Sequence, residues 1–470
     1  MIIKPQDLVR LNPWWSNPDE IESDTKIVEA LSKKPTKGYA YTSIANTILL
    51  GPRQVGKTTY LKLMIRHLIR HQVDPRRILY FSCELLENKR DIIDLLSLYD
   101  SMFSDVAGCK YVLLDEVTFA REWEAAIKYF LDTGMSENKV IYATGSSSIW
   151  LFKGFERMPG RNIRVRVFMP LTFREYVELF GSQYLKSELN EIESFNLSKL
   201  VNLKSLYDRA LKLSPFINEV NALFRNYLKT GGFLKPSYEL KCHSNISEET
   251  YLDYVKWIEG DLALLGRKIT LLRKLMLPLI ERVSTKFSYA KLAREADLRS
   301  HVTVRDYIEV LEGLLLLRVF YQTSPISKMP DYRKEKKVYF TDPFLYSVFK
   351  GYSYGVYRDY SHENESAIVE GIIGEHLARQ FRDHHARVMF YVEKGETDFT
   401  ILKENMKLLG VEVKWSRNVS KMDFANRHRF REKILVSMQD LEYYEEDKML
   451  IIPAPLFLIL LSKHQLYFIE

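Results

Sequence analysis

The stretch Gly51-Pro52-Arg53-Gln54-Val55-Gly56-Lys57-Thr58-Thr59 decides the fold of the N-terminal part of this chain. An apolar run, Ile48–Leu50, precedes it, and a helical pattern over Tyr60–Arg70 follows it. This order of strand, glycine loop and helix is the context that the phosphate-binding pattern G-x-x-x-x-G-K-[S/T] requires. Backbone N–H groups of such a loop, together with the helix N-terminus, form a cradle for phosphates. The stretch therefore predicts nucleotide binding rather than a structural glycine turn.

Two residues of this stretch have expected roles beyond the cradle. Lys57 is predicted to reach the outer phosphates of ATP, and the hydroxyl of Thr58 to ligate Mg²⁺. The whole of Gly51–Thr59 is the predicted cofactor-binding segment, and ATP with Mg²⁺ is the predicted cofactor pair.

Length and composition place the chain among multidomain globular proteins. Its 470 residues predict about three domains. The three cysteines, Cys83, Cys109 and Cys242, have no paired spacing, which argues against a disulfide framework or zinc site and fits a reducing cytoplasm. The most apolar run, Met449–Leu461, contains two prolines and falls short of the roughly 18–20 residues that span a bilayer. We expect a cytoplasmic protein with no signal peptide and no membrane partner.

Short apolar runs alternate with amphipathic helical patterns in the N-terminal part, which predicts a parallel sheet covered by helices. The expected strands are Thr47–Leu50, Arg77–Phe81, Tyr111–Leu114, Val140–Thr144 and Ile163–Phe168. A capping box at Thr172-Phe-Arg-Glu175 predicts the start of a helix. Residues 186–262 are expected to be mostly helical, with a break at Gly231-Gly232.

Two carboxylates, Asp115 and Glu116, end the third apolar run. Asp115 is predicted to hold Mg²⁺ through water, and Glu116 to orient and polarise the water that attacks the γ-phosphate. The fourth run ends in Thr144-Gly-Ser146, where ATPases with an extra strand between the two motifs place a polar residue that senses the γ-phosphate. We assign Ser146 to this role with Thr144 as the alternative, and an ordinary glycine turn stays open. Arg161 could act in trans as an arginine finger, or be a surface arginine.

Together these motifs resemble the predicted AAA+ ATPases of the AAA_14 type from archaea and bacteria. The resemblance covers nearly the whole chain and also includes Pro170-Leu-Thr-Phe-Arg-Glu-Tyr176 and Tyr227-Leu-Lys-Thr-Gly-Gly-Phe233. It implies an AAA+ (ASCE) parallel-sheet domain, a finger role for Arg161, assembly as a homo-oligomer, and a C-terminal winged-helix and nuclease-like region. Asn12-Pro-Trp-Trp-Ser is a local feature with no role that we can assign from sequence.

A winged helix-turn-helix is predicted from helical patterns at 287–296 and 301–311 and strand patterns at 315–321 and 336–340. Residues 267–337 hold 16 Lys/Arg and 8 Asp/Glu, and this local excess of base suggests DNA as a partner. A solvated surface, or a winged helix used for packing, remains the alternative. The candidate DNA contacts lie at the start of the second helix, where a recognition helix would meet a major groove. They are Arg299, Ser300, His301, Thr303 and Arg305.

The C-terminal part carries separated acidic residues that resemble the PD-(D/E)xK nuclease motif. The set is Glu375 on a helix, Asp398 on a strand, and Glu412 with Lys414 on the next strand. Residues i and i+2 of a strand share one face, so Glu412 and Lys414 project together. The carboxylates could bind a second Mg²⁺ or Mn²⁺ while Lys414 positions a water. An exposed charge pair at a sheet edge is the alternative.

These patterns predict an α/β protein with four consecutive parts. They are an AAA+ P-loop ATPase domain at 1–185, a helical connection at 186–262, a winged helix at 263–350 and a restriction-endonuclease-like α/β domain at 362–470. The expected function is Mg²⁺-dependent ATP binding and hydrolysis that acts on DNA or is regulated by it, and the nuclease-like site could cleave DNA. The alternative is an ATP-driven oligomerisation or signalling switch whose nuclease-like domain is inactive and contacts proteins.

Overall fold

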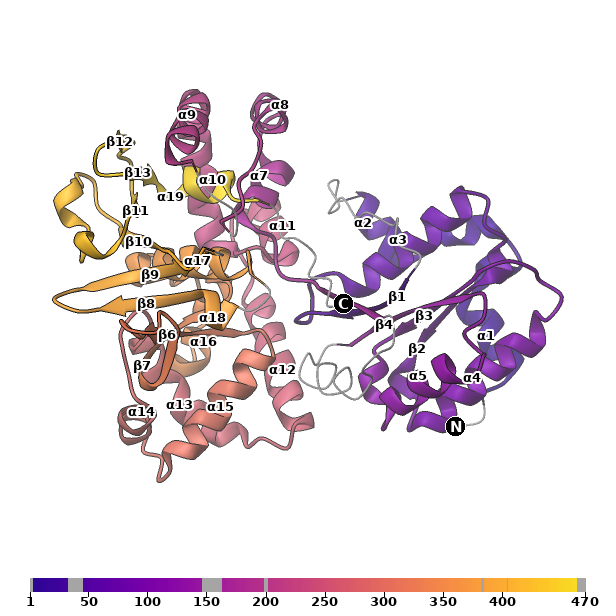
Figure 1. Ribbon diagram of the computed structural model, residues 1–470. Coiled ribbons are helices and arrows are strands. Elements are labelled where there is room, and N and C mark those ends of the chain that lie inside the picture. Colours follow the sequence, from indigo (N-terminus) through magenta and orange to yellow (C-terminus); the bar gives the residue numbers. More distant parts are fainter. Residues whose placement is uncertain are drawn as a thin grey trace. The chain divides into compact units, whose positions relative to one another are not determined.

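The computed structural model describes residues 3–32, 45–145, 163–197, 202–381, 384–403 and 405–462. The chain divides into two compact units, with the boundary between Met169 and Pro170 (Figure 1). The C-terminal unit therefore begins before the predicted boundary at residue 185, and it contains all three of the parts predicted to follow. Each unit is described below by itself.

A five-stranded, entirely parallel sheet forms the centre of the N-terminal unit, as the alternating sequence pattern predicts. Its strands run in the order β2-β3-β4-β1-β5, so β4 lies between β1 and β3, the two strands that precede the predicted phosphate loop and carboxylates. The strands are β1 Asn46–Leu50, β2 Ile78–Ser82, β3 Lys110–Asp115, β4 Lys139–Thr144 and β5 Ile163–Val167.

Helices connect these parallel strands, because a parallel neighbour cannot be reached through a tight turn. The connecting helices are α3 Lys57–Arg70, α4 Lys89–Met102 and α5 Trp123–Asp132, while α1 Pro5–Leu11 and α2 Thr25–Ser32 precede β1. Apolar side chains from strands and helices, including Leu79, Val112, Leu114, Leu95 and Ile127, are buried together in one core. No described helix has both the length and the apolar character needed to cross a bilayer.

The Asn12-Pro-Trp-Trp segment covers the outer edge of this sheet. The Asn12 side chain acts like a neighbouring strand, because its Oδ1 accepts the backbone N–H of Tyr80 at 2.7 Å and its Nδ2 donates to the Tyr80 carbonyl at 3.0 Å. The indole N–H groups of Trp14 and Trp15 both donate to the carbonyl of Ile78, at 3.1 and 2.8 Å. The segment thus satisfies backbone groups of β2 that would otherwise form an open edge.

The C-terminal unit combines many helices with one eight-stranded mixed sheet. Its helices are α7 Phe173–Phe180, α8 Gln183–Glu191, α9 Leu203–Leu213, α10 Ile217–Thr230, α11 Leu234–His243, α12 Glu248–Leu264, α13 Ile269–Glu281, α14 Tyr289–Glu295, α15 His301–Gly313, α16 Pro343–Tyr354, α17 Glu365–Ala378, α18 His384–Arg387 and α19 Ala454–Leu460. The predicted capping box is confirmed, since the Thr172 hydroxyl accepts from the N–H of Glu175 and the Glu175 carboxylate accepts from the N–H of Thr172.

The strands of this second sheet follow the order β12-β13-β11-β10-β9-β8-β6-β7. They are β6 Leu317–Thr323, β7 Pro330–Phe340, β8 Val388–Val392, β9 Glu396–Leu402, β10 Leu408–Lys414, β11 Glu432–Ser437, β12 Glu442–Tyr444 and β13 Met449–Pro453. The helices and strands expected for the winged helix are present as α14, α15, β6 and β7. However, β6 pairs with β8 through Gln322 and Phe390, so this hairpin shares a sheet with the strands of the predicted nuclease-like domain.

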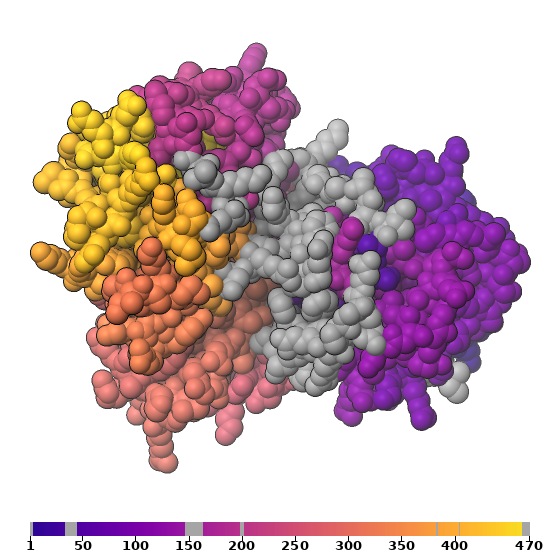
Figure 2. Space-filling view, in the orientation of Figure 1, coloured from indigo at the N-terminus to yellow at the C-terminus, as the bar shows by residue number. Residues whose placement is uncertain are grey.

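Segments far apart in sequence pack together within the C-terminal unit. The space-filling view shows the yellow C-terminal surface adjoining the magenta surface near residue 200 (Figure 2). Tyr207 of α9 and Tyr443 of β12 contribute to this contact, with ring centroids 6.1 Å apart.

A buried polar junction holds the start of the C-terminal unit in place. Tyr227 donates its hydroxyl to the carbonyl of Leu171 at 2.8 Å, and the Leu171 N–H donates to the carbonyl of Gly232 at 2.9 Å. Gly232 in turn donates its N–H to the carboxylate of Asp342 at 2.8 Å. The Arg379 guanidinium donates to the carbonyl of Pro170 at 2.9 Å. Three segments distant in sequence, at 227–232, 342 and 379, thereby fix Pro170 and Leu171.

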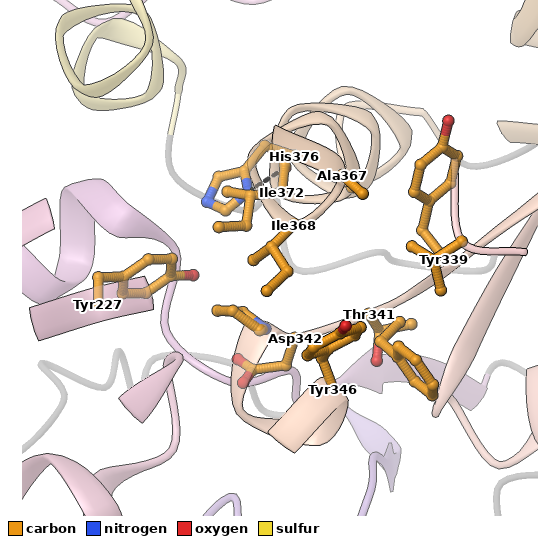
Figure 3. A pocket seen from close by; sticks show the side chains of 13 residues that line it. Tyr227, Tyr339, Thr341, Asp342, Tyr346, Ala367, Ile368, Ile372 and His376 are labelled. Atoms are coloured by element: carbon orange, nitrogen blue, oxygen red, sulfur yellow. Dashed lines mark hydrogen bonds between the residues drawn. The ribbon is translucent and has the colours of Figure 1, made fainter. Parts of the chain in front are cut away.

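A small cavity lies at this junction (Figure 3). Figure 3 shows the side chains of Tyr227, Asp342, Tyr346 and His376 around it, drawn from separate helices and loops. Its volume of about 20 Å³ is enough for roughly one water molecule and too small for a substrate. The cavity is therefore a structural feature of the junction rather than a binding site.

His376 of this junction makes stability depend on pH. Its Nε2 accepts the N–H of Phe173 at 3.0 Å, and burial lowers its pKa to about 3. Between pH 6.5 and about pH 3, His376 is protonated in the unfolded chain but neutral in the folded one. Acidification in this range therefore lowers the free energy of unfolding. We expect His376→Gln to be less stable than the wild type at pH 7.5, and this gap to narrow by about 2 kcal/mol at pH 5.0. Unfolding of both full-length chains at the two pH values measures the gap, and an unchanged gap would contradict a neutral His376.

Candidate functional site

The predicted phosphate loop lies between the end of β1 and the start of α3. Gln54 and Gly56 have positive φ values, 64° and 94°, and Gly56 is the N-cap residue of α3. Left-handed backbone at these positions turns the chain back on itself, so that successive N–H groups can line one concave face. The local geometry therefore matches the phosphate cradle expected from the sequence.

Lys57 is buried at the first turn of α3. Its ammonium donates to the carbonyl oxygens of Gly51 and Pro52, both at 2.9 Å, so backbone groups of the loop itself hold the side chain in place. Thr58 follows directly and is half-buried. An ammonium and a hydroxyl at the N-terminus of a helix fit the outer phosphates and the Mg²⁺ of ATP, respectively.

Gly51 allows the loop to pass close to the end of β5. A Cβ at this position would lie 2.2 Å from the carbonyl oxygen of Phe168, and φ is +154°. Phe168 also donates its N–H to the carbonyl of Leu50 at 2.6 Å. The start of the cradle is therefore fixed against the segment that leads out of this unit.

Asp115, Glu116 and Thr144 meet at the ends of β3 and β4. Asp115 is buried, and one of its carboxylate oxygens accepts a short hydrogen bond from the Thr144 hydroxyl. The same Thr144 oxygen accepts the backbone N–H of Glu116 at 3.0 Å. Glu116 has a positive φ of 54° and is only half-buried. Thr144, the alternative to Ser146 for the polar residue of this strand, thus contacts both acidic residues.

Tyr80 is a further member of this site that the sequence analysis did not identify. Its hydroxyl donates to the second carboxylate oxygen of Asp115 at 3.1 Å. Burial, and then the charge of Asp115, raise the pKa of this phenol, so it stays protonated and remains a donor. The ammonium of Lys62 lies 3.7 Å from the centroid of the same ring. A tyrosine in the otherwise apolar run Ile78–Phe81, next to the strand of Asp115, was the available signal.

Ser146 and Arg161 lie outside the described residues, so the proposed γ-phosphate sensor and arginine finger stay predictions. The remaining members of the predicted nucleotide site follow β1 or lie at the ends of β3 and β4 in the parallel sheet of the N-terminal unit. A buried lysine at the cradle, a buried aspartate and an accessible glutamate can together neutralise phosphates, hold a divalent cation and orient a water molecule.

Comparison with known proteins adds a sequence match to this geometry. Residues 45–177 match the family model of an AAA domain. The N-terminal unit therefore contains a region that is similar to an AAA domain. This region is followed by two segments, residues 221–354 and 365–457, that match two domains of unknown function.

The similarity to individual proteins extends along most of the chain. An uncharacterized protein of Methanocaldococcus jannaschii is 28% identical over 423 residues, which are 88% of this chain and 84% of that protein. The Walker-type ATPase of Pyrococcus abyssi is 15% identical over 74% of this chain and 97% of its own, with a TM-score of 0.39. The ORC1 protein of Aeropyrum pernix, solved in complex with DNA, is 14% identical over 72% and 95%, with a TM-score of 0.28. The similarity to an AAA domain rests on the family match, and the loop geometry agrees with it.

The second predicted site contains three of its four expected residues. Asp398, Glu412 and Lys414 lie near one another on β9 and β10, and Lys414 contacts Glu412 with an N–O distance of 2.7 Å. Glu375, predicted as the fourth member, is engaged elsewhere. It is fully buried in ion pairs with Arg318, at 2.7 Å, and with Arg379, at 2.8 Å.

The carboxylate that α17 contributes is Glu370, which lies just over one helical turn before Glu375. Glu370 interacts electrostatically with Asp398 and Glu412. Glu396 joins them because it shares the ammonium of Lys337 with Glu370 and Asp398. The four carboxylates of Glu370, Glu396, Asp398 and Glu412 are called the acidic cluster below. Burial, followed by the charge of Asp398, raises the pKa of Glu370 to about 7 and that of Glu412 to about 8.

The predicted DNA-contact residues surround the start of α15. Arg299, His301 and Arg305 are exposed, and Thr303 is half-buried. Ser300 instead caps the helix, because its hydroxyl accepts the N–H of Val302 at 3.2 Å.

The basic charge of this region is smaller at the surface than the sequence suggests. Arg305 lies 3.5 Å from Asp306 and 3.6 Å from Glu309, which partly neutralise it. Arg318, Lys336 and Lys337 are buried and therefore cannot contact a nucleic acid.

Proposed function

We propose that this protein is a Mg²⁺-dependent AAA+ ATPase that acts on DNA or is regulated by it, and that it works as a homo-oligomer. The observation that carries the proposal is the placement of Lys57, Asp115 and Glu116 directly after β1 and at the end of β3, two strands of one parallel sheet. Measurement of ATP turnover by the purified chain, with and without duplex DNA, tests it. A chain that neither binds nor hydrolyses ATP would remove this function.

The residues of the site divide the chemistry among themselves. The loop N–H groups and Lys57 bind and neutralise the phosphates, and Thr58 and Asp115 would hold Mg²⁺, which supplies charge stabilisation at the γ-phosphate. Glu116 would orient the attacking water and accept its proton. Tyr80 and Thr144 keep the Asp115 carboxylate in one orientation through their hydroxyl groups. Ser146 and Arg161 complete the proposal as γ-phosphate sensor and as finger from a neighbouring subunit.

Binding to DNA is proposed for the surface at the start of α15. Exposed Arg299 and Arg305 support it, as does the adjoining β6–β7 hairpin, whose tip exposes 95% of Ile326 beside Lys328. Contacts of arginine with phosphate release counterions, so the resulting affinity should depend on salt and hardly on sequence.

The expected result is that wild-type protein binds short duplex DNA at low salt with a steep loss of affinity as salt increases. Replacing both Arg299 and Arg305 by Ala should weaken binding to all sequences and lower the slope of log affinity against log salt by about 2. Lys204→Ala, which removes an exposed lysine of α9, should leave both quantities unchanged. Fluorescence anisotropy at several salt concentrations measures them, and equal slopes for all three proteins would exclude these contacts.

A second candidate function is a nucleotide-driven switch whose C-terminal sheet contacts proteins instead of cleaving DNA. The favouring observation is that Lys337 of β7 contacts three carboxylates of the acidic cluster. Within the described residues, three metal-ligating groups come within 4.8 Å of one another only at Glu312, His384 and His385, and not in the acidic cluster. This candidate predicts no cleavage of DNA in the presence of Mg²⁺.

A further inference from the structure

Lys337 lies on β7, outside the predicted nuclease motif, yet its ammonium enters the acidic cluster. The side chain is almost completely buried, with 1% of its surface exposed. Its Nζ lies 2.9 Å from a carboxylate oxygen of Glu370, 2.5 Å from Glu396 and 3.3 Å from Asp398. An ammonium has three N–H donors and no acceptor, so these three carboxylates match its full hydrogen-bonding capacity.

Several of the oxygens that a divalent cation would need are already engaged. Asp398 directs Oδ1 at Lys337, and its Oδ2 accepts the backbone N–H of Val413 at 2.9 Å. Glu412 contacts Lys414 through Oε1, while its Oε2 is buried without a hydrogen-bond partner among the described residues. Mg²⁺ and Mn²⁺ bind through several carboxylate and water oxygens that surround one point. Here it is the Lys337 ammonium that lies among the carboxylates of Glu370, Glu396 and Asp398.

Charge makes the two occupants mutually exclusive. A buried ammonium repels a dication placed among the same carboxylates, because burial reduces the screening by water. Conversely, buried carboxylates without a nearby cation would be strongly unfavourable. Lys337 supplies the compensating positive charge as a permanent part of the chain.

We propose that Lys337 takes the place of a divalent cation in the acidic cluster, so that the wild-type chain binds neither Mg²⁺ nor Mn²⁺ there and performs no metal-dependent cleavage at this site. Lys337 is then the residue that separates this cluster from a catalytic metal centre. The inference sharpens the second candidate function but is independent of ATP hydrolysis in the N-terminal unit.

Replacing Lys337 by Met tests the proposal, because Met keeps an unbranched stem and removes the charge. In the absence of nucleotide, Lys337→Met should bind Mn²⁺ at least about tenfold more tightly than the wild type, and the additional change Asp398→Asn should abolish this gain. Mn²⁺ should also raise the unfolding temperature of Lys337→Met and not that of the wild type. The matched control is Lys336→Met, since the neighbouring buried ammonium donates to the carbonyls of Tyr332 and Lys334 and, among the described residues, forms no ion pair with the acidic cluster.

Calorimetric titration with Mn²⁺ measures these affinities in the full-length chain. Wild-type binding of Mn²⁺ that Asp398→Asn abolishes would overturn the proposal, and so would a folded Lys337→Met that gains no Mn²⁺ affinity.

If Lys337→Met does not fold, oxidative cleavage by Fe²⁺ and ascorbate tests the wild type directly. Cuts in β9 or β10 would overturn the proposal, and an uncut sheet, beside a metal-binding protein that is cut in parallel, supports it. ATP turnover, measured separately, decides the first proposed function, so failure of one proposal is distinguishable from failure of the other.

Discussion

Glu116→Gln should abolish steady-state ATP hydrolysis while ATP-Mg²⁺ binding is retained. Gln has the size of Glu but cannot accept a proton from the attacking water, and loss of a general base lowers turnover by about 10²-fold or more. Binding should survive because Lys57 and the loop N–H groups, which hold the phosphates, are unchanged. The backbone of Glu116 also keeps its hydrogen bond to Thr144.

Two other variants make this expectation specific. Lys57→Ala should lose nucleotide binding together with hydrolysis, since it removes the ammonium from the cradle. Glu84→Gln neutralises an exposed carboxylate in the same unit and should leave turnover unchanged. Phosphate release and binding of a fluorescent ATP analogue report the two quantities. Turnover by Glu116→Gln close to that of the wild type would exclude Glu116 as the base.

The N-terminal unit follows closely from its sequence because its signals are local. Each expected strand is a short apolar run, and each lies within about a residue of the strand observed, as with Val140–Thr144 and β4. The phosphate loop is likewise contiguous, so its glycines, Lys57 and Thr58 are recognisable without knowledge of the fold. The role of Tyr80 is not recognisable from the sequence, because it depends on the pairing of β2 with β3.

The acidic cluster shows why the other site could be predicted only in part. Asp398 and Glu412 lie on strands whose alternation reveals which side chains share a face. Helix α17 offers no such signal, because it is buried along nearly its whole length, and both Glu370 and Glu375 are compatible with its sequence. The choice between them is made by tertiary contacts, with Arg318 pairing with Glu375 and Lys337 with Glu370.

The pair Gly231-Gly232 was predicted only as a break between helices, but its main requirement is close approach between backbones. A Cβ on Gly232 would lie 2.1 Å from the carbonyl oxygen of Leu171 and 2.4 Å from its nitrogen. A Cβ on Gly231 would lie 1.7 Å from a carboxylate oxygen of Asp342. Such contacts join segments distant in sequence, so no local pattern could reveal them.

Gly232→Ala should therefore destabilise the C-terminal unit by at least about 3 kcal/mol, because the added methyl group overlaps backbone atoms that cannot rotate away. Accommodation would require displacement of Leu171, which breaks its hydrogen bonds with Gly232 and Tyr227. Those bonds belong to the junction that fixes the residues after β5, so we expect the whole unit to respond.

Gly260→Ala is the matched control for this prediction. Gly260 lies inside α12, and a Cβ there would meet nothing within 4 Å. The substitution should stabilise the helix by up to about 1 kcal/mol, since Ala is the better helix former. Thermal and urea unfolding of the two variants and the wild type should therefore give shifts of opposite sign. Equal stability of Gly232→Ala and the wild type would mean that the buried junction around Leu171 does not have the packing described here.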